Sequence, residues 1–111
     1  MKSEKLTDRK CVACERGIPP LVSEEVMTLS HQLSGWSVIE GKKLEKTWKF
    51  HDFLSALAFV NRVGELSEKE GHHPDIFLGW GKVKLTLWTH VIHGLSENDF
   101  ILAAKVDHLD K

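Results

Sequence analysis

The hydrophobic positions of this 111-residue chain follow two different spacings, and the changes between them predict seven secondary-structure elements. Hydrophobic residues three or four apart are typical of amphipathic helices, whereas alternation of hydrophobic and polar residues is typical of half-buried strands. Helices are predicted over 23–34, over 53–71 and from residue 96 onward. Strands are predicted over 36–40, 43–50, 76–80 and 82–90.

The four predicted strands form two hairpins, each with one polar face, and Gly41 and Gly81 mark their turns. The apolar faces of the second and fourth strands contain Leu44, Trp48, Phe50, Val83, Leu85 and Leu87. Because an apolar sheet face must be covered, we expect the helices to pack on it. The sequence therefore predicts an α+β two-layer sandwich, in which helices cover one face of a four-stranded antiparallel sheet in the order α-β-β-α-β-β-α.

The two longer helices carry recognisable end signals. The middle helix is expected to follow Asp52, whose side chain can cap it, and to end at Gly71. The last helix opens at Ser96 with Asp99 three residues later, a variant of the capping box. The apolar stripe of the middle helix is expected along Phe53, Leu57, Val60 and Gly64, widened by Leu54 and Phe59.

Length and composition predict one domain preceded by a leader. Residues 1–20 contain Cys11-x-x-Cys14 and are expected to be flexible, whereas residues 21–111 form the folded domain. In a reducing compartment the two cysteines are expected to be thiols rather than a disulfide. The pair alone is a weak zinc signal, because a zinc site normally takes four ligands and the chain has no second pair. Zinc shared between two subunits is a minor alternative.

Charge and hydropathy narrow the classes of function. A net charge of −1 argues against a nucleic-acid surface built on bulk charge. No apolar run approaches the roughly 18 residues that a membrane span needs. The charged N-terminus is not a secretory signal, so we expect a soluble cytoplasmic protein.

Three of the seven histidines fall on two neighbouring predicted elements. His72 and His73 precede the third strand, and His90 ends the fourth. Because these strands form a hairpin, the start of one meets the end of the other, and the three side chains should converge. Histidine exchanges protons near neutral pH, so the cluster indicates a proton-transfer site; the alternative is loop histidines at a strand end. Pro74 keeps His73 extended, so His72 and His73 should point apart rather than share a metal ion.

Other side chains near the histidines have a structural and a functional interpretation. Asp99 can cap the last helix, support the site, or do both. Glu68 lies about one turn before His72 and can orient its imidazole, or it can be an exposed helix residue. Trp36 and Trp80 can form a wall against an aromatic ligand, or pack in the core or at an interface.

The spacing of these residues resembles the signature of the pterin-4a-carbinolamine dehydratase family, which in this chain reads Glu68-x-x-x-His72-His73-Pro74, Trp80, His90 and Asp99. The resemblance covers most of residues 18–109, including Gly35-Trp36 and the run Gly94-Leu95-Ser96-Glu97-Asn98-Asp99. The leader over 11–21 is similar to one found in microbial members. The family fold is the same α+β sandwich.

The resemblance implies that the chain dehydrates a 4a-hydroxytetrahydropterin to a quinonoid dihydropterin, without a metal or an organic cofactor. It implies that His72, His73 and His90 are catalytic and surround the hydroxyl on C4a. The substrate-binding residues that it implies are His73, Trp36, Pro74 and Asp75, with Glu68 and Asp99 as supporting carboxylates. Because members form dimers and some form tetramers, the resemblance also implies a homodimer or homotetramer, and it allows an aromatic amino acid hydroxylase as a pathway partner.

Two other functions stay open at this point. Members of the same family bind a transcription factor and stabilise its dimer, which makes a non-catalytic interaction module one alternative. A relative acting on another substrate, or a helper of another enzyme, is the second. The presence of all three histidines favours a working site, because a scaffold needs none of them.

Overall fold

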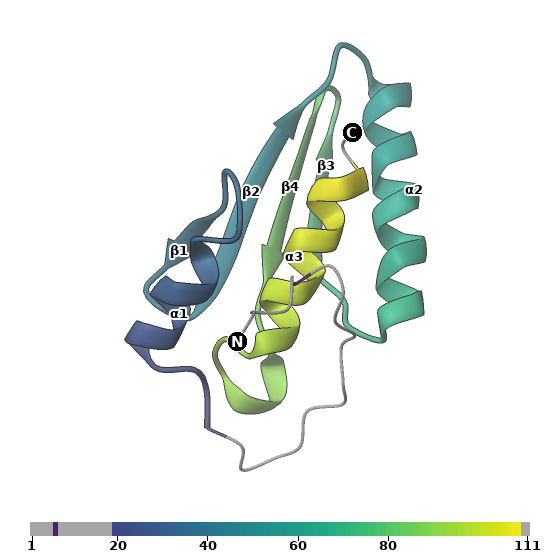
Figure 1. Cartoon of the computed structure of the whole chain (residues 1–111). Helices are drawn as coiled ribbons and strands as arrows, with labels where there is room; N and C mark the ends of the chain where they lie inside the picture. Colours follow the sequence, from purple (N-terminus) through teal and green to yellow (C-terminus); the bar gives the residue numbers. More distant parts are fainter. Residues whose placement is uncertain (1–5, 7–18, 110–111) are drawn as a thin grey trace.

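The computed structural model describes Leu6 and residues 19–109, and Figure 1 shows the helices packed on one side of a single sheet. The elements are α1 (Ser23–Ser30), β1 (Ser37–Ile39), β2 (Lys43–Lys49), α2 (Phe53–Glu70), β3 (Asp75–Gly79), β4 (Lys82–Leu87), the short 3-10 helix η2 (His90–Ile92) and α3 (Glu97–Leu109). The predicted α+β sandwich and its element order are confirmed.

The sheet has the strand order β1-β2-β4-β3, and every neighbouring pair is antiparallel. The two predicted hairpins are therefore joined through their second strands, with Leu44 opposite Leu87 and Trp48 opposite Val83. In the β3–β4 pair, Asp75 at the start of β3 lies opposite Thr86 near the end of β4. This register brings the loop before β3 beside the loop after β4.

The hydrophobic core lies between the sheet and the helices, and α2 and α3 contribute most of its helical side. The sheet supplies Leu44, Trp48, Val83, Leu85 and Leu87, and the helices supply Val26, Ala56, Phe59, Val63, Phe100, Ile101, Leu102, Ala103, Ala104 and Val106. Leu6 is also buried in this core. Cys11 and Cys14 fall outside the described residues, so the leader stays a prediction.

The buried face of α2 differs from the predicted stripe. Its buried residues are Ala56, Phe59, Val63 and Ser67, whereas Phe53 and Leu54 are 43% and 74% exposed. The observed stripe is shifted by one residue, which corresponds to about 100° of rotation about the helix axis. Two of these buried residues are not strongly hydrophobic, so the sequence pattern did not indicate that they face the core. Ala56 is small, and Ser67 is polar but satisfied, because its hydroxyl donates to the Val63 carbonyl at 2.8 Å.

Several predicted boundaries are also corrected. Helix α1 ends at Ser30 rather than 34, and Val22 is its N-cap, with its amide donating to Glu25 Oε1 at 3.0 Å. Trp36 precedes β1 instead of belonging to it. Strand β4 ends at Leu87, because the chain closes a tight loop in which the Thr89 amide donates to the Gly94 carbonyl at 2.8 Å.

The predicted ends of α2 are confirmed. The Ser55 amide donates to Asp52 Oδ1 at 2.8 Å, and this hydrogen bond, with a second from the Ser55 hydroxyl, holds the pKa of Asp52 below its ordinary value. Gly71 ends the helix at a φ of 69°, a left-handed conformation that glycine adopts without steric cost. The chain therefore leaves α2 abruptly and turns directly into the residues before β3.

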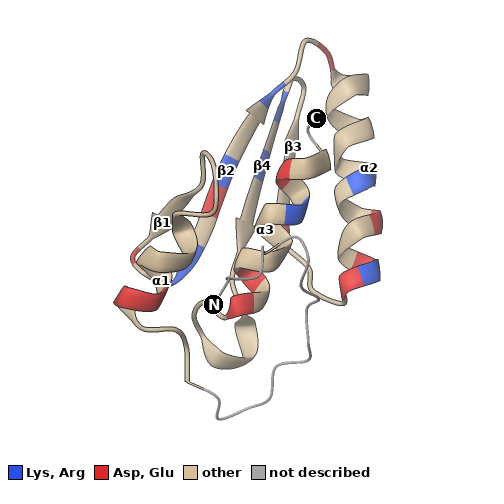
Figure 2. Ribbon diagram, in the orientation of Figure 1, with Lys and Arg blue, Asp and Glu red and all other residues tan. Residues whose placement is uncertain are grey.

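Charged side chains lie mainly away from the core, and Lys46 is one of the few that are largely buried. Figure 2 shows basic positions along β2 and β4 and acidic ones on α1 and at the start of α3. Lys46 lies between Leu44 and Trp48 on the covered face of β2. Its ammonium group donates to Asp107 Oδ1 at 2.8 Å and to the Ser34 carbonyl at 2.7 Å. The charge on this face is therefore paired.

Replacing Phe59 by alanine should lower the free energy of unfolding by about 3–5 kcal/mol, because it leaves a cavity in the core. The Phe59 ring is fully buried and packs 4.9 Å from Trp48 and 5.4 Å from Phe50, measured between ring centroids. Urea unfolding would measure the change. The matched control on the same helix is Leu54→Ala, which should stay within about 0.5 kcal/mol; equal effects would contradict the observed rotation of α2.

No helix in the described part of the chain is both long enough and apolar enough to cross a membrane.

Candidate active site

The loop before β3 and the loop after β4 form a cleft of about 420 Å³ at one end of the sheet. The antiparallel pairing of these two strands puts the loops side by side. The residues lining the cleft are Gly71, His72, His73, Pro74, Asp75, Trp88, Thr89, His90, Val91 and Asn98. The three histidines that the hairpin should bring together therefore do share one cleft.

His72 is held by a buried carboxylate. Its Nε2 lies 2.6 Å from Asp99 Oδ1, and the side chains of His72 and Asp99 are 13% and 0% exposed. His72 reaches this position because Gly71 ends α2 immediately before it, and Asp99 reaches it from the first turn of α3. An imidazole paired with a carboxylate in this way has a fixed ring orientation.

Asp99 is also the predicted cap of α3, because it accepts from the Ser96 amide three residues before it. Its Oδ2 accepts from the Ser96 amide at 2.9 Å and from the Thr89 hydroxyl at 2.8 Å. Thr89 is buried and its hydroxyl lies 2.8 Å from that of Ser96. The carboxylate is therefore fixed by the start of α3 and by the loop after β4 at the same time.

His73 has a different carboxylate partner and a wetter environment. Its Nε2 hydrogen-bonds Glu68 Oε2, and the two side chains are 57% and 78% exposed. The expectation that Glu68 orients His72 is therefore wrong: Glu68 contacts His73, and Asp99 contacts His72. An exposed pair of this kind is screened by water and orients its imidazole only weakly.

His90 lies at the start of η2, lines the cleft and packs against Trp88, which was not among the site residues predicted from the sequence. The rings of His90 and Trp88 meet edge to face with their centroids 4.1 Å apart. The Trp88 indole donates to Asp75 Oδ2 at 3.3 Å, and the ammonium group of Lys43 lies 4.7 Å from its ring centroid. The signal was present, because Trp88 and His90 share a face at a spacing of two.

The two tryptophans expected as walls do not line this cleft. Trp36 donates from Nε1 to Asp107 Oδ1 at 3.0 Å and packs edge to face on Trp48 at 5.6 Å. Trp80 lies in the turn between β3 and β4, at the far end of β3 from the histidines, and is 70% exposed. Trp88 is the tryptophan that the fold brings to the histidines.

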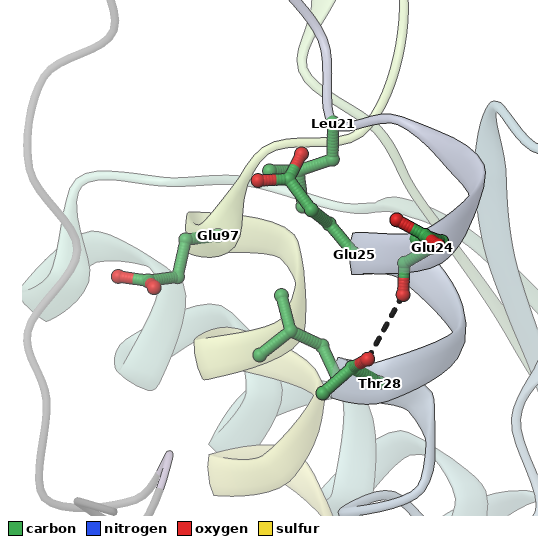
Figure 3. A pocket seen from close by; sticks show the side chains of 6 residues that line it. Leu21, Glu24, Glu25, Thr28 and Glu97 are labelled. Atoms are coloured by element: carbon green, nitrogen blue, oxygen red, sulfur yellow. Dashed lines mark hydrogen bonds between the residues drawn. The ribbon is translucent and has the colours of Figure 1, made fainter.

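A larger cavity, of about 520 Å³, lies elsewhere and carries no histidine. Figure 3 shows it between α1 and the start of α3, where Glu24, Glu25 and Glu97 surround it. The Thr28 hydroxyl there donates to the Glu24 carbonyl at 2.9 Å, a contact within the helix. We therefore place the candidate site in the smaller cleft, because it holds the groups that can transfer protons.

The histidine cleft can supply an acid and a base a short distance apart. A neutral imidazole carries one ring nitrogen that can donate a proton and one that can accept it, which makes histidine the commonest general acid and base. Within the described residues no three His, Cys, Asp or Glu side chains are grouped as metal ligands. The arrangement suits a reaction in which one proton is donated and another is accepted at neighbouring atoms of a small ligand.

Similarity to known proteins shows which family the chain belongs to. The model of the pterin 4 alpha carbinolamine dehydratase family matches residues 19–109, which is most of the chain. This chain belongs to that family. A relative from Rubrobacter xylanophilus, named as a candidate pterin-4-alpha-carbinolamine dehydratase, is 51% identical over 104 residues that cover 94% of this chain and 97% of the relative.

Other relatives of the pterin 4 alpha carbinolamine dehydratase family agree in sequence and fold. A protein of the same name from Alkaliphilus metalliredigens is 53% identical over 92% of this chain and 93% of its own length. A solved structure described as a transcriptional coactivator/pterin dehydratase from Brucella melitensis is 30% identical, with a TM-score of 0.77, over 83% of this chain and 99% of that one. A pterin dehydratase-like protein described as a RuBisCO assembly factor is 29% identical, with a TM-score of 0.58, over 68% and 89%.

Proposed function

We propose that this chain dehydrates 4a-hydroxytetrahydropterin, the 4a-carbinolamine, to quinonoid dihydropterin and water in tetrahydrobiopterin recycling. One observation carries the proposal: His72, backed by the buried Asp99, shares a single cleft with His73 and His90. The family and the names of the relatives support a pterin dehydratase.

The reaction needs two proton transfers at neighbouring atoms. The C4a–O bond breaks, and an acid protonates the departing oxygen so that it leaves as water. A base takes the hydrogen from N5, and the N–H bond electrons form the N5=C4a double bond. An acid and a base in position each contribute roughly 10²–10⁴-fold to such a step. No oxidant or reductant takes part.

We assign the proton transfers to His72 and His90 and the binding of the pterin mainly to His73. His72 has the fixed ring, because Asp99 holds its Nε2. His73 is more than half exposed, which suits contact with an incoming ligand. Pro74 and Asp75 complete the substrate-binding side of the cleft. Trp36 is left out of this assignment, because it does not line the cleft.

The test of the proposal is catalytic. 4a-Hydroxytetrahydropterin is generated freshly, and its conversion to quinonoid dihydropterin is followed by absorbance with and without the folded protein. We expect a large acceleration that is proportional to protein concentration. A folded protein that leaves the spontaneous rate unchanged would contradict the proposal, and would favour the alternative of an interaction or helper protein with the same fold.

We also propose that the chain works as a cytoplasmic homodimer or homotetramer, in a pathway with an aromatic amino acid hydroxylase. Two exposed hydrophobic side chains are available to a second copy: Trp80 in the β3–β4 turn and Phe77 on the edge strand β3, at 70% and 54% exposure. Sedimentation equilibrium should give two or four times the 12.6 kDa chain mass. A mass of one chain at micromolar concentration would contradict this part of the proposal.

A further inference from the structure

Thr89 contacts the supporting carboxylate of the cleft, although no feature of the sequence pointed to it. It is 4% exposed, lies between Trp88 and His90, and donates from its hydroxyl to Asp99 Oδ2 at 2.8 Å. The same hydroxyl lies 2.8 Å from the Ser96 hydroxyl. Asp99 therefore accepts hydrogen bonds from the loop after β4 and from the start of α3, in addition to its contact with His72.

The directions of these hydrogen bonds follow from counting hydrogens. A hydroxyl has one hydrogen, and Thr89 gives it to Asp99, so Ser96 must be the donor in the contact between the two hydroxyls. A carboxylate only accepts, so the short contact between Asp99 Oδ1 and His72 requires the hydrogen on Nε2 of the ring. The neutral ring of His72 then has its lone pair on Nδ1.

We propose that Thr89 is a positioning residue that fixes the Asp99 carboxylate, so that His72 keeps its hydrogen on Nε2 and offers Nδ1 to the substrate. The inference rests on the proposed dehydratase function. Among the described residues Nδ1 of His72 has no hydrogen-bond partner, and His72 lines the cleft. Nδ1 is thus the atom of His72 that exchanges a proton with the pterin.

The hydroxyl of Thr89 matters because the orientation of the Asp99 carboxylate is set by donors from two places, the loop after β4 and the start of α3. The Ser96 amide alone would hold Oδ2 by a single hydrogen bond, and the carboxylate could still turn about the Cβ–Cγ bond of Asp99. The Thr89 hydroxyl adds a second, independent anchor from the loop after β4. Without it the contact at Oδ1 loosens, and the His72 ring samples both tautomers.

The test compares Thr89→Val, which keeps the shape but removes the hydroxyl, with Thr89→Ser, which keeps the hydroxyl. The ring nitrogens of His72 are read by long-range proton–nitrogen NMR, and the dehydration rate is measured on the same samples. Thr89→Val should lower the Nε2-protonated fraction of the neutral His72 ring and reduce kcat more than it raises KM. The expected loss is roughly 10- to 100-fold, the range found when the partner of a metal-binding histidine is removed. Thr89→Ser should restore both readouts.

The control is Thr86→Val on β4, where the lost hydroxyl contacts Glu45 Oε2 at 3.4 Å outside the cleft. It should leave both readouts unchanged. The inference would be overturned if Thr89→Val had the same His72 nitrogen signals and the same dehydration rate as the wild type. It would also be overturned if Thr89→Ser changed both readouts as much as Thr89→Val does. If Thr89→Val does not fold, Thr89→Cys, with its weak donor, takes its place, and unchanged His72 nitrogens there would also overturn it.

The two claims can fail separately. If the wild type accelerates no dehydration while Thr89→Val still alters the His72 nitrogens, the proposed function fails and the positioning contact stands. If the wild type is active and Thr89→Val matches it in both readouts, the contact fails and the function stands.

Discussion

A His72→Ala variant should dehydrate 4a-hydroxytetrahydropterin roughly 10²–10⁴-fold more slowly than the wild type, the range expected for the loss of one acid–base group. The reason is local. His72 is the histidine whose ring is fixed by a buried carboxylate, with Asp99 Oδ1 2.6 Å from its Nε2. Stopped-flow absorbance at saturating substrate would measure kcat directly.

His90→Ala should cause a loss of similar size, because His90 is the second histidine to which we assign a proton transfer. His31→Ala is the matched control: His31 is exposed at the end of α1 and does not line the cleft. It should retain the wild-type rate. If His72→Ala and His90→Ala each kept the full rate in folded protein, the assignment of proton transfer would be wrong.

Asp99→Asn should reduce both activity and stability. An amide in this position cannot accept hydrogen bonds on both of its ends, so it clashes either with the His72 N–H or with the Thr89 and Ser96 donors. The free energy of unfolding should fall by about 1–3 kcal/mol, the cost of one unsatisfied buried group. The rate should fall roughly 10²–10⁴-fold, because the His72 ring loses its fixed tautomer. Urea unfolding and the dehydration assay measure the two effects.

The matched control for Asp99→Asn is Asp107→Asn, also on α3. Asp107 holds Lys46 at 2.8 Å and the Trp36 indole at 3.0 Å, away from the histidine cleft. This variant should lose stability and keep the wild-type kcat. A kinetic loss in Asp107→Asn as large as that in Asp99→Asn would show that the effect is general loosening of α3 rather than the loss of the His72 partner.

The convergence of the histidines was predictable because it depends on topology. Once 76–80 and 82–90 are read as a hairpin, residues 72–73 and 90 must meet at one end of the sheet, whatever the rotamers. The Asp99 cap was predictable for a similar reason, because the three-residue offset from Ser96 fixes its geometry. These inferences use backbone connectivity alone.

The partners of the histidines were not predictable, because they depend on tertiary packing. Glu68 lies about one turn before His72 in sequence, yet the left-handed Gly71 redirects the chain, and Glu68 meets His73 instead. Thr89 contacts Asp99 only because the loop after β4 packs on the first turn of α3. The rotation of α2 was missed for a related reason, since Ala56 and Ser67 face the core although neither is strongly hydrophobic.

The most direct test of the central claim is the dehydration rate of freshly generated 4a-hydroxytetrahydropterin with the wild type, with the His72→Ala/His90→Ala double variant and without protein. We expect a large acceleration by the wild type and a rate close to the spontaneous one with the double variant, while circular dichroism shows both to be folded. An equal acceleration by the two proteins, or none by the wild type, would contradict the central claim.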